Sequence, residues 1–82
     1  MNNSLFSEFA ARFAAESTPS LVNSFNRQVG NRDWSSARAF HDKALIEELE
    51  RRGIDVSAIY DDKSVSFAHH VELQGNTLVT ID

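Results

Sequence analysis

The side chains with the widest chemical scope in this sequence are its three histidines, His41 and the adjacent His69 and His70. A histidine can serve as a metal ligand, a general base or a pH-sensitive charge. Successive side chains of a strand point to opposite faces, so His69 and His70 cannot chelate one metal ion without a bulge. We expect His41 to lie at the edge of the core with one hydrogen bond, and we predict no metal site.

Other motifs that bind cofactors or carry out catalysis are missing from the sequence. The acidic pair Asp61 and Asp62 lacks the glycine and the closing glutamate of a calcium-binding loop. Each of the three glycines is explained by a helix end or a turn, and no serine stands in the pattern of a nucleophile elbow. The sequence therefore predicts no catalytic residue, no cofactor and no small-molecule substrate, and we expect the protein not to be an enzyme.

Basic side chains gather in the first half of the chain. The first 45 residues carry five basic and four acidic side chains, whereas residues 46–82 carry three basic and eight acidic ones. The net charge of −4 disfavours general attraction to nucleic acid but leaves room for a local basic surface. The residues that we single out for binding at this surface are Arg27, Arg32, Arg38, His41 and Lys43.

The same region has the order of a helix-turn-helix segment. Residues 19–29 are predicted to be helical, Gly30 supplies a short turn, and a longer helix follows. Against this interpretation, Asn31 stands where such motifs usually place an apolar side chain, and the longer helix is acidic in its second half. A nucleic-acid-associated regulator that uses residues 19–45 is therefore the alternative function, and nucleic acid the alternative partner.

Apolar spacing indicates two helices in the first 30 residues. Residues 4–16 place three phenylalanines on one helical face. Residues 19–29 form a second apolar stripe, with Thr18 as the expected cap and Pro19 in the first turn, where its missing N–H has no helical partner. Gly30 suits the left-handed position that ends such a helix.

A third helix is predicted over residues 34–52, with Asp33 as its cap and Gly53 just beyond its end. Its apolar arc consists of Trp34, Ala37, Phe40, His41, Ala44, Leu45 and Leu49. Two acid-first pairs at i,i+4 spacing are expected on its solvated face, Glu47–Arg51 and Glu48–Arg52.

The rest of the chain reads as strand. Residues 64–73 alternate between apolar and polar, and residues 77–81 are rich in β-branched side chains. Gly75 and Asn76 suit a two-residue hairpin loop, which pairs Leu73 with Leu78. Residues 56–60 fit either an edge strand or a single helical turn. The face of the first strand predicted to be apolar consists of Val65, Phe67, His69, Val71 and Leu73.

These elements predict one α+β domain over residues 1–82, with three helices followed by a small antiparallel hairpin or a three-stranded meander packed on them. The sequence contains no cysteine, no apolar run that could span a membrane and no secretory signal, so we expect a cytoplasmic protein without a membrane partner. The predicted function is a small non-catalytic protein–protein interaction or accessory module. Its partner is an unknown protein or a second copy of the chain in a homodimer.

Overall fold

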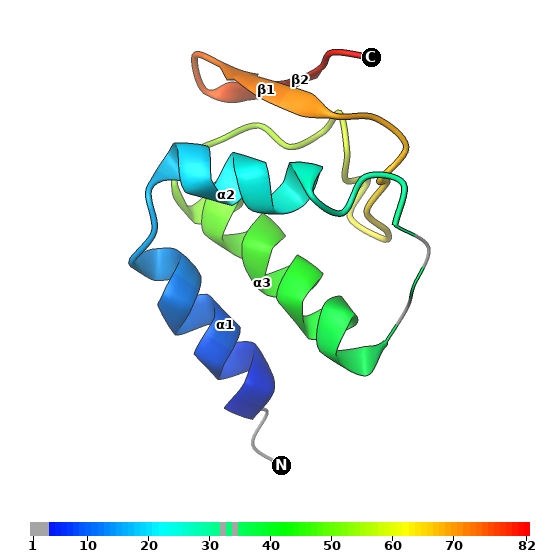
Figure 1. The fold of residues 1–82 in the computed structure, drawn as a ribbon. Helices are drawn as coiled ribbons and strands as arrows, with labels where there is room; N and C mark the ends of the chain where they lie inside the picture. The colour runs from blue at the N-terminus through cyan, green and yellow to red at the C-terminus, as the bar shows by residue number, and fades with distance from the viewer. Residues whose placement is uncertain (1–3, 32, 34) are drawn as a thin grey trace.

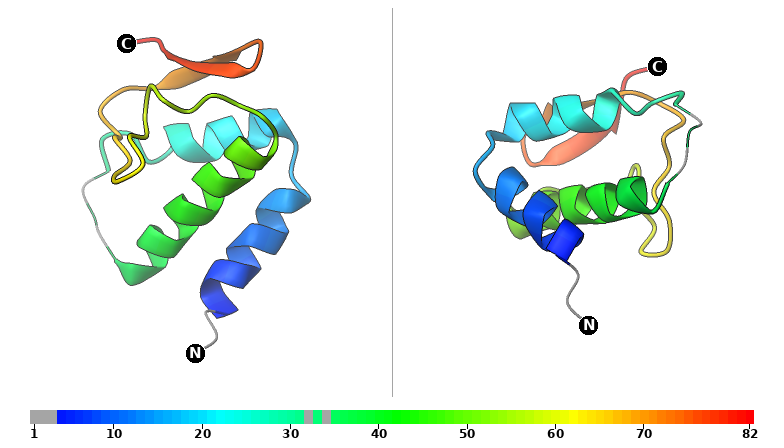
Figure 2. Two further views of the ribbon diagram at one scale, coloured as in Figure 1. Left: turned by 180° about the vertical axis from the view of Figure 1, so that it is seen from behind. Right: turned by 60° about the horizontal axis from the view of Figure 1, so that its bottom comes forward.

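The computed structural model describes residues 4–31, 33 and 35–82, and it folds as three helices followed by a two-stranded antiparallel sheet. Its elements are α1 (Ser4–Ala14), α2 (Thr18–Asn26), α3 (Ser36–Arg51), β1 (Val71–Gln74) and β2 (Thr77–Thr80). The helices α1 and α3 lie side by side, α2 crosses α3, and the hairpin packs on the other side of α2 (Figure 1; Figure 2). The predicted α+β class and the hairpin are confirmed.

Serine hydroxyls begin the second and third helices. The Oγ atoms of Ser17 and Ser35 accept backbone N–H groups three residues on, at 3.2 and 3.1 Å. Both serines have extended backbone, which is the conformation of an N-cap residue. The predicted caps, Thr18 and Asp33, are therefore wrong, and α3 begins two residues later than predicted. Trp34, which was assigned to the apolar arc of this helix, lies outside the described residues.

The first two helices are shorter than predicted, and glycines with positive φ follow α2 and α3. The first two helices end at Ala14 and Asn26, earlier than predicted, and turns continue the chain. Gly30 and Gly53 have φ of +79° and +77°. Gly53 directly follows the C-cap of α3, as predicted, whereas Gly30 lies three residues beyond Arg27, the C-cap of α2, and so does not end that helix as predicted. The N–H groups of Gly53 and Ile54 bond back to α3 carbonyls at 2.9 and 3.1 Å, which is the Schellman pattern.

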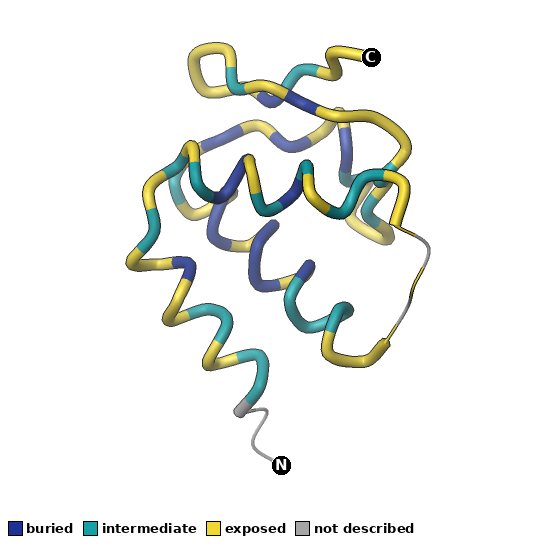
Figure 3. The backbone as a smooth tube through the Cα atoms, viewed as in Figure 1, coloured by how far each residue is buried: buried dark blue, intermediate teal, exposed yellow. Residues whose placement is uncertain are grey.

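The core lies between the three helices and continues under the hairpin (Figure 3). The predicted aromatic face of α1 packs inward, with Phe13 fully buried and Phe6 and Phe9 partly buried. Among the described residues, Ile81 is the exposed large apolar side chain. None of the helices that the structure describes has both the length and the apolar character of a membrane span. The largest fully buried side chains are Phe13, Phe25, Leu21, Leu45, Leu49, Leu78 and Val71.

The predicted strand over residues 64–73 is wrong for most of its length, because only its end belongs to β1. Phe67 leaves the alternating pattern to stack on Phe25, with ring centroids 4.9 Å apart, and its carbonyl accepts the N–H of Gly30 at 3.4 Å. His69 is exposed instead of sharing the buried face. The start of the segment pairs instead with the preceding turn, through an antiparallel bridge between Val65 and Tyr60, and Phe67 contacts α2.

Residues 56–60 form a turn, so the structure contains the hairpin and not the three-stranded meander. The N–H groups of Ile59 and Tyr60 both bond to the carbonyl of Val56, at 3.0 and 2.9 Å. The side chain of Asp55 accepts the N–H of Ser57 at 2.9 Å at the start of this turn. Of the two alternatives for this segment, the helical turn is the one observed.

The hairpin has the predicted register, in which Leu73 faces Leu78 across the Gly75-Asn76 loop. It is tied to α2 by one side chain. The amide of Asn26 donates to the carbonyl of Val71 and accepts its N–H, both at 2.9 Å. This pair of hydrogen bonds joins segments 45 residues apart and fixes the position of β1 against α2.

Candidate functional site

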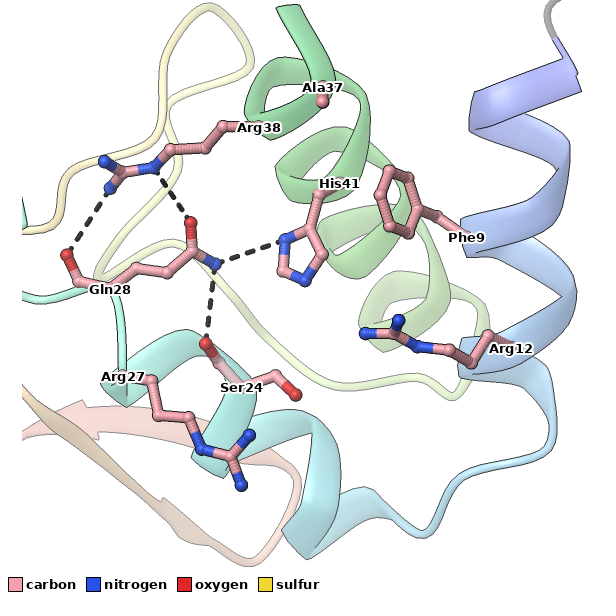
Figure 4. A pocket seen from close by; sticks show the side chains of 8 residues that line it. All are labelled: Phe9, Arg12, Ser24, Arg27, Gln28, Ala37, Arg38 and His41. Carbon is pink, nitrogen blue, oxygen red and sulfur yellow. Dashed lines mark hydrogen bonds between the residues drawn. The ribbon is translucent and has the colours of Figure 1, made fainter. Parts of the chain in front are cut away.

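A pocket of about 320 Å³ opens between α1, α2 and the first half of α3. Figure 4 shows its side chains, which come from all three helices and the turn after α2. They include three guanidinium groups and one imidazole, and none is a carboxylate. The lining residues are Phe9, Arg12, Ser24, Arg27, Gln28, Ala37, Arg38 and His41.

Arg38 forms one wall of the pocket and holds the segment that links α2 to α3. Its Nε donates to Oε1 of Gln28 at 3.0 Å, and its Nη1 donates to the carbonyls of both Asn31 and Asp33, at 2.8 and 2.6 Å. The guanidinium also lies over the ring of Phe67, 5.0 Å from the centroid. With a side chain 13% exposed, Arg38 is committed to the fold and to the shape of the pocket.

Gln28 lies between Arg38 and His41 and contacts both side chains. A guanidinium N–H can only donate, so the amide oxygen of Gln28 faces Arg38 and the amide NH₂ faces the other way. Gln28 Nε2 lies 3.3 Å from Nδ1 of His41 and 3.4 Å from the carbonyl of Ser24. When Nδ1 accepts this hydrogen bond, the neutral imidazole carries its proton on Nε2, the nitrogen turned away from Gln28 (Figure 4).

The imidazole of His41 is held on its other sides by aromatic rings and a carboxylate. The rings of Phe9 and Phe13 meet it edge to face, with centroids 5.1 and 5.0 Å away. Oδ1 of Asp42 lies 3.1 Å from Nδ1, the same atom that faces Gln28. A protonated Nδ1 donates to Asp42 and an unprotonated one accepts from Gln28, so the ring makes one of the two bonds at a time.

Asp42 is a buried carboxylate directly behind the pocket, with 5% of its side chain exposed. Among the residues that the structure describes, its Oδ2 has no hydrogen-bond partner, and it lies 3.6 Å from Nε of Arg38, which already donates to Gln28. Unpartnered buried oxygens are rare in folded proteins, and each one calls for an explanation. The charge of Asp42 balances that of Arg38, so Arg38 adds little net charge to the pocket.

The two remaining arginines supply the net positive charge. Arg27 is exposed, and among the residues that the structure describes its guanidinium has no ion pair or hydrogen bond. Arg12 lies over the rings of Phe9 and Phe13, and its one ion pair, with Glu16, is 3.4 Å long. Because 58% of the Arg12 side chain is exposed, that surface pair is weak.

The structure brings three of the five predicted binding residues into this pocket, namely Arg27, Arg38 and His41. Lys43 is exposed and lines a different cavity, of about 270 Å³, between α3 and the segment from Tyr60 to Phe67. Arg32 lies outside the described residues. Three residues of the expected binding surface therefore line one pocket, and Lys43 lies apart from them at another cavity.

Sequence reasoning missed three polar members of the pocket, Arg12, Ser24 and Gln28. A signal for Arg12 was present, because it follows Phe9 by three residues and so lies at the border of the aromatic face. Gln28 follows the predicted apolar stripe but carries no pattern of its own. Its role depends on Arg38 and His41, which approach it only in the folded chain.

The other two histidines contact Asp82 and do not form a set of metal ligands with His41. His70 bonds Asp82 through both its backbone N–H and its Nδ1, at 2.7 Å each, and His69 lies 3.7 Å from the same carboxylate. The hydrogen bonds from His70 hold the pKa of Asp82 below its usual value. Within the described ranges, no group of three histidine, aspartate or glutamate side chains is placed to hold a metal ion.

A second cluster of charged residues lies at the other end of α3. Nε of Arg52 donates to Oε2 of Glu48 at 2.7 Å, and Arg51 binds both oxygens of the same carboxylate. The Glu48–Arg52 pair was predicted at this spacing, but not its environment: the side chain of Glu48 is 6% exposed. Arg51 pairs with Glu48 and not with Glu47 as predicted. Hydrogen bonds from Arg51, and then from Arg52, lower the pKa of Glu48 against the opposing effect of burial.

Arg52 also joins α3 to the end of α1. Its NH2 donates to the carbonyls of Phe13 and Glu16 at 2.9 and 2.6 Å, and its NH1 donates to Oγ1 of Thr18 at 3.0 Å. The carbonyl of Phe13 belongs to the last turn of α1 and also accepts the N–H of Glu16 at 3.1 Å, and that of Glu16 lies just beyond the helix. This cluster lines no part of the pocket in Figure 4 and is explained by its structural role.

The chemistry that the pocket offers is hydrogen-bond donation to an anion. Exposed guanidinium groups, an imidazole N–H and a serine hydroxyl surround a recess with one aromatic wall, and no acidic side chain lines it. Comparison with known proteins adds no further assignment: the chain matches no family model, no curated protein and no solved structure.

Proposed function

We propose that this chain is a non-catalytic binding module that captures an anionic group of a partner protein in the pocket between its three helices. The observation that carries the proposal is Arg27, an exposed guanidinium without an ion pair or hydrogen bond among the described residues, at a pocket without a carboxylate. Arg12 approaches the same recess with only a weak surface ion pair. An acidic side chain inserted there gains charge-assisted hydrogen bonds.

Two observations favour a protein over nucleic acid as the partner. The helix-turn-helix hypothesis relied on Arg38 at the surface, and this guanidinium is turned inward to Gln28 and to the carbonyls of the linking segment. The net charge of −4 opposes binding to a long array of phosphates, which requires several cations at once. A single recessed site with two available arginines suits one acidic group.

The proposal is tested by titrating the ¹⁵N-labelled protein with the peptide acetyl-Gly-Glu-Glu-Gly-amide and following the backbone signals of Ser24, Arg27 and His41. We expect saturable shifts, and an affinity about tenfold lower in Arg27→Gln and in Arg12→Gln. The matched control is Lys63→Gln, which removes one exposed positive charge from a turn outside the pocket. No saturable shift, or equal losses in all three variants, would reject the pocket as the site.

A parallel titration with random-sequence duplex DNA distinguishes binding to a protein partner from the alternative function, binding to nucleic acid. Binding to DNA through phosphates weakens steeply between about 50 and 200 mM salt. DNA that displaces the peptide and depends on salt in this way would replace the protein partner with nucleic acid. We expect no such binding.

The proposal includes the homodimer and the cytoplasmic location expected from the sequence. A second copy of the chain is one candidate partner, and the lack of cysteine suits a reducing compartment. Light scattering over a concentration series checks the first point, since a monomer mass at every concentration would reject the dimer. The anion-binding proposal does not depend on that result.

A further inference from the structure

We infer that the anion for which this pocket is built is a phosphate monoester, carried as a dianion on the side chain of a partner peptide. This inference rests on the proposed function, because it uses the same pocket and names the chemical class of its ligand. Three features of the pocket support it: the number of available charges, the directions from which the donors come, and the tautomer of His41.

The charge of the pocket matches a dianion better than a monoanion. Arg38 is compensated by the buried carboxylate of Asp42, 3.6 Å away. Arg27 has no ion pair in the described part of the chain, and Arg12 has only the exposed pair with Glu16. Two guanidinium charges therefore remain for a ligand. A phosphate monoester carries a charge of about −1.5 to −2 near neutral pH, whereas a carboxylate carries about −1.

The donors approach the recess from three directions. Arg12 projects from α1, Arg27 from the end of α2 and His41 from α3, with Ser24 on the α2 side (Figure 4). A carboxylate presents two oxygens in one plane, which a single bidentate arginine satisfies. A phosphate monoester presents three terminal oxygens around a tetrahedral centre, so it can accept from three helices at once.

The hydrogen bond from Gln28 makes His41 a donor to the ligand. Arg38 orients the amide of Gln28, and the amide N–H points at Nδ1 of His41, 3.3 Å away. With Nδ1 accepting, the ring carries a proton on Nε2, the nitrogen on the side away from Gln28. A neutral ring with its proton on Nδ1 donates to Asp42 instead and leaves Nε2 an acceptor, whereas a doubly protonated ring donates from both nitrogens. Gln28 is therefore a positioning residue for this site.

The pocket also has room for the carrier of the phosphate. Its volume of about 320 Å³ is roughly ten times the share of one water molecule in the liquid. The ring of Phe9 and the methyl group of Ala37 provide an apolar part of the lining against which a peptide side chain or backbone can pack. Free phosphate fills the polar part alone, so a peptide-borne phosphate is the ligand that the whole pocket fits.

The test is calorimetry on the full chain with three probes: acetyl-Gly-phosphoserine-Gly-amide, the same peptide with glutamate in place of phosphoserine, and inorganic phosphate. We expect the phosphopeptide to bind at least tenfold more tightly than the glutamate peptide. Arg27→Gln and Arg12→Gln should each lose about tenfold for the phosphopeptide, while Lys63→Gln should retain full affinity. The fold of each variant is checked by circular dichroism.

A second readout examines His41 and Gln28 directly. Titration with the phosphopeptide should shift the ¹⁵N signal of the imidazole Nε2, and Gln28→Ala should reduce the affinity about threefold while leaving the arginine contribution intact. Gln28→Glu should also lower the phosphopeptide affinity, because glutamate lacks the amide N–H that faces Nδ1 of His41 and orients the imidazole. A phosphopeptide affinity unchanged in both Gln28 variants, with no imidazole shift, would overturn the role of this pair.

The remaining outcomes separate the two proposals. A glutamate peptide that binds as tightly as the phosphopeptide overturns the phosphate inference and leaves the proposed function in place. Inorganic phosphate that binds as tightly as the phosphopeptide overturns the peptide as carrier and assigns the site to the free ion. Failure of all three probes rejects the anion pocket and with it both proposals.

Discussion

The helix α3 carries two arginine–carboxylate pairs with the same spacing, Arg38 with Asp42 near its start and Glu48 with Arg52 at its end. In each pair the carboxylate is buried. In each pair the arginine also binds backbone carbonyls near the end of another helix: those after α2 for Arg38, and those of Phe13 and Glu16 around the end of α1 for Arg52. The same two residue types thus fasten both neighbouring helices to α3.

The two pairs differ in how fully the carboxylate is satisfied. Both oxygens of Glu48 accept hydrogen bonds from arginines, whereas Oδ2 of Asp42 has none and Oδ1 competes with Gln28 for His41. A satisfied ion cluster is explained by its structural role, and an incompletely satisfied one next to a pocket is a candidate for function. The two ends of the helix therefore differ in the hydrogen bonds that the buried carboxylate makes within the described residues, and not in the types of residue present.

The largest effect is expected from removing the arginine of the satisfied cluster. Arg52→Ala removes the side-chain donor to the carbonyls of Phe13 and Glu16, of which that of Phe13 keeps its bond from the Glu16 N–H, and it deprives buried Glu48 of one partner. We expect a loss of about 3 kcal/mol in the free energy of unfolding, measured by urea denaturation. Arg51→Ala is the matched control, because its side chain is 65% exposed and it binds Glu48 alone; a loss of similar size there would show that the carbonyl bonds of Arg52 matter little.

A smaller effect, with a defined pH dependence, is expected from Glu48→Gln. Folding lowers the pKa of Glu48, so the stabilisation by this carboxylate is complete above its ordinary pKa of 4.5 and is lost as the pH falls through the lowered value. At pH 7 the variant should lose about 2 kcal/mol. As the pH falls from 4.5 through the lowered pKa of Glu48, the two proteins should converge in thermal stability, and a constant difference across this range would contradict the assignment.

The glycine that ends α3 should matter less than the ion cluster beside it. Gly53 has φ of +77°, and an added Cβ would meet no atom within 4 Å, so the expected cost is backbone strain alone. We expect Gly53→Ala to lose about 1–2 kcal/mol in urea denaturation. Unchanged stability would show that Arg52, and not the glycine, determines where this helix ends.

The smallest effect is expected at the incompletely satisfied carboxylate. Asp42→Asn removes a charge whose Oδ2 accepts no hydrogen bond, so its stability should change by less than about 1 kcal/mol. Its effect should fall on the pocket instead, because Arg38 then adds an uncompensated positive charge and anion affinity should rise. A loss above about 2 kcal/mol without a change in affinity would make this pair as structural as the other.

The parts of the fold that could be predicted are those whose cause is local. The three helices, the left-handed positions of Gly30 and Gly53 and the pairing of Leu73 with Leu78 follow from spacing and turn chemistry within a few residues. The segment over residues 64–70 could not be predicted, because its alternation fits a strand, whereas Phe67 packs against two residues distant in the sequence, Phe25 and Arg38. The helix caps were misplaced by one or two residues, since several adjacent side chains were suitable acceptors.

The candidate site was predictable in its parts and not in its arrangement. Arg27, Arg38 and His41 were selected for their charge and position, but the sequence placed them on an open surface. The recess arises because Arg12 and Phe9 of α1 close its other side, and a contact between helices more than 20 residues apart has no signature in local spacing. The inward turn of Arg38 depends on carbonyls freed where α2 ends, which also becomes visible only in the folded chain.

The amide of Asn26 has a consequence for how the molecule behaves at high concentration. By bonding both backbone groups of Val71, it occupies the positions that an additional strand from another molecule would use along this border of the hairpin. On the opposite border, the carbonyl of Asp55 accepts the N–H of Leu78 at 3.0 Å. One side chain and one loop thus occupy part of each border of the short sheet, which limits the addition of strands from other molecules.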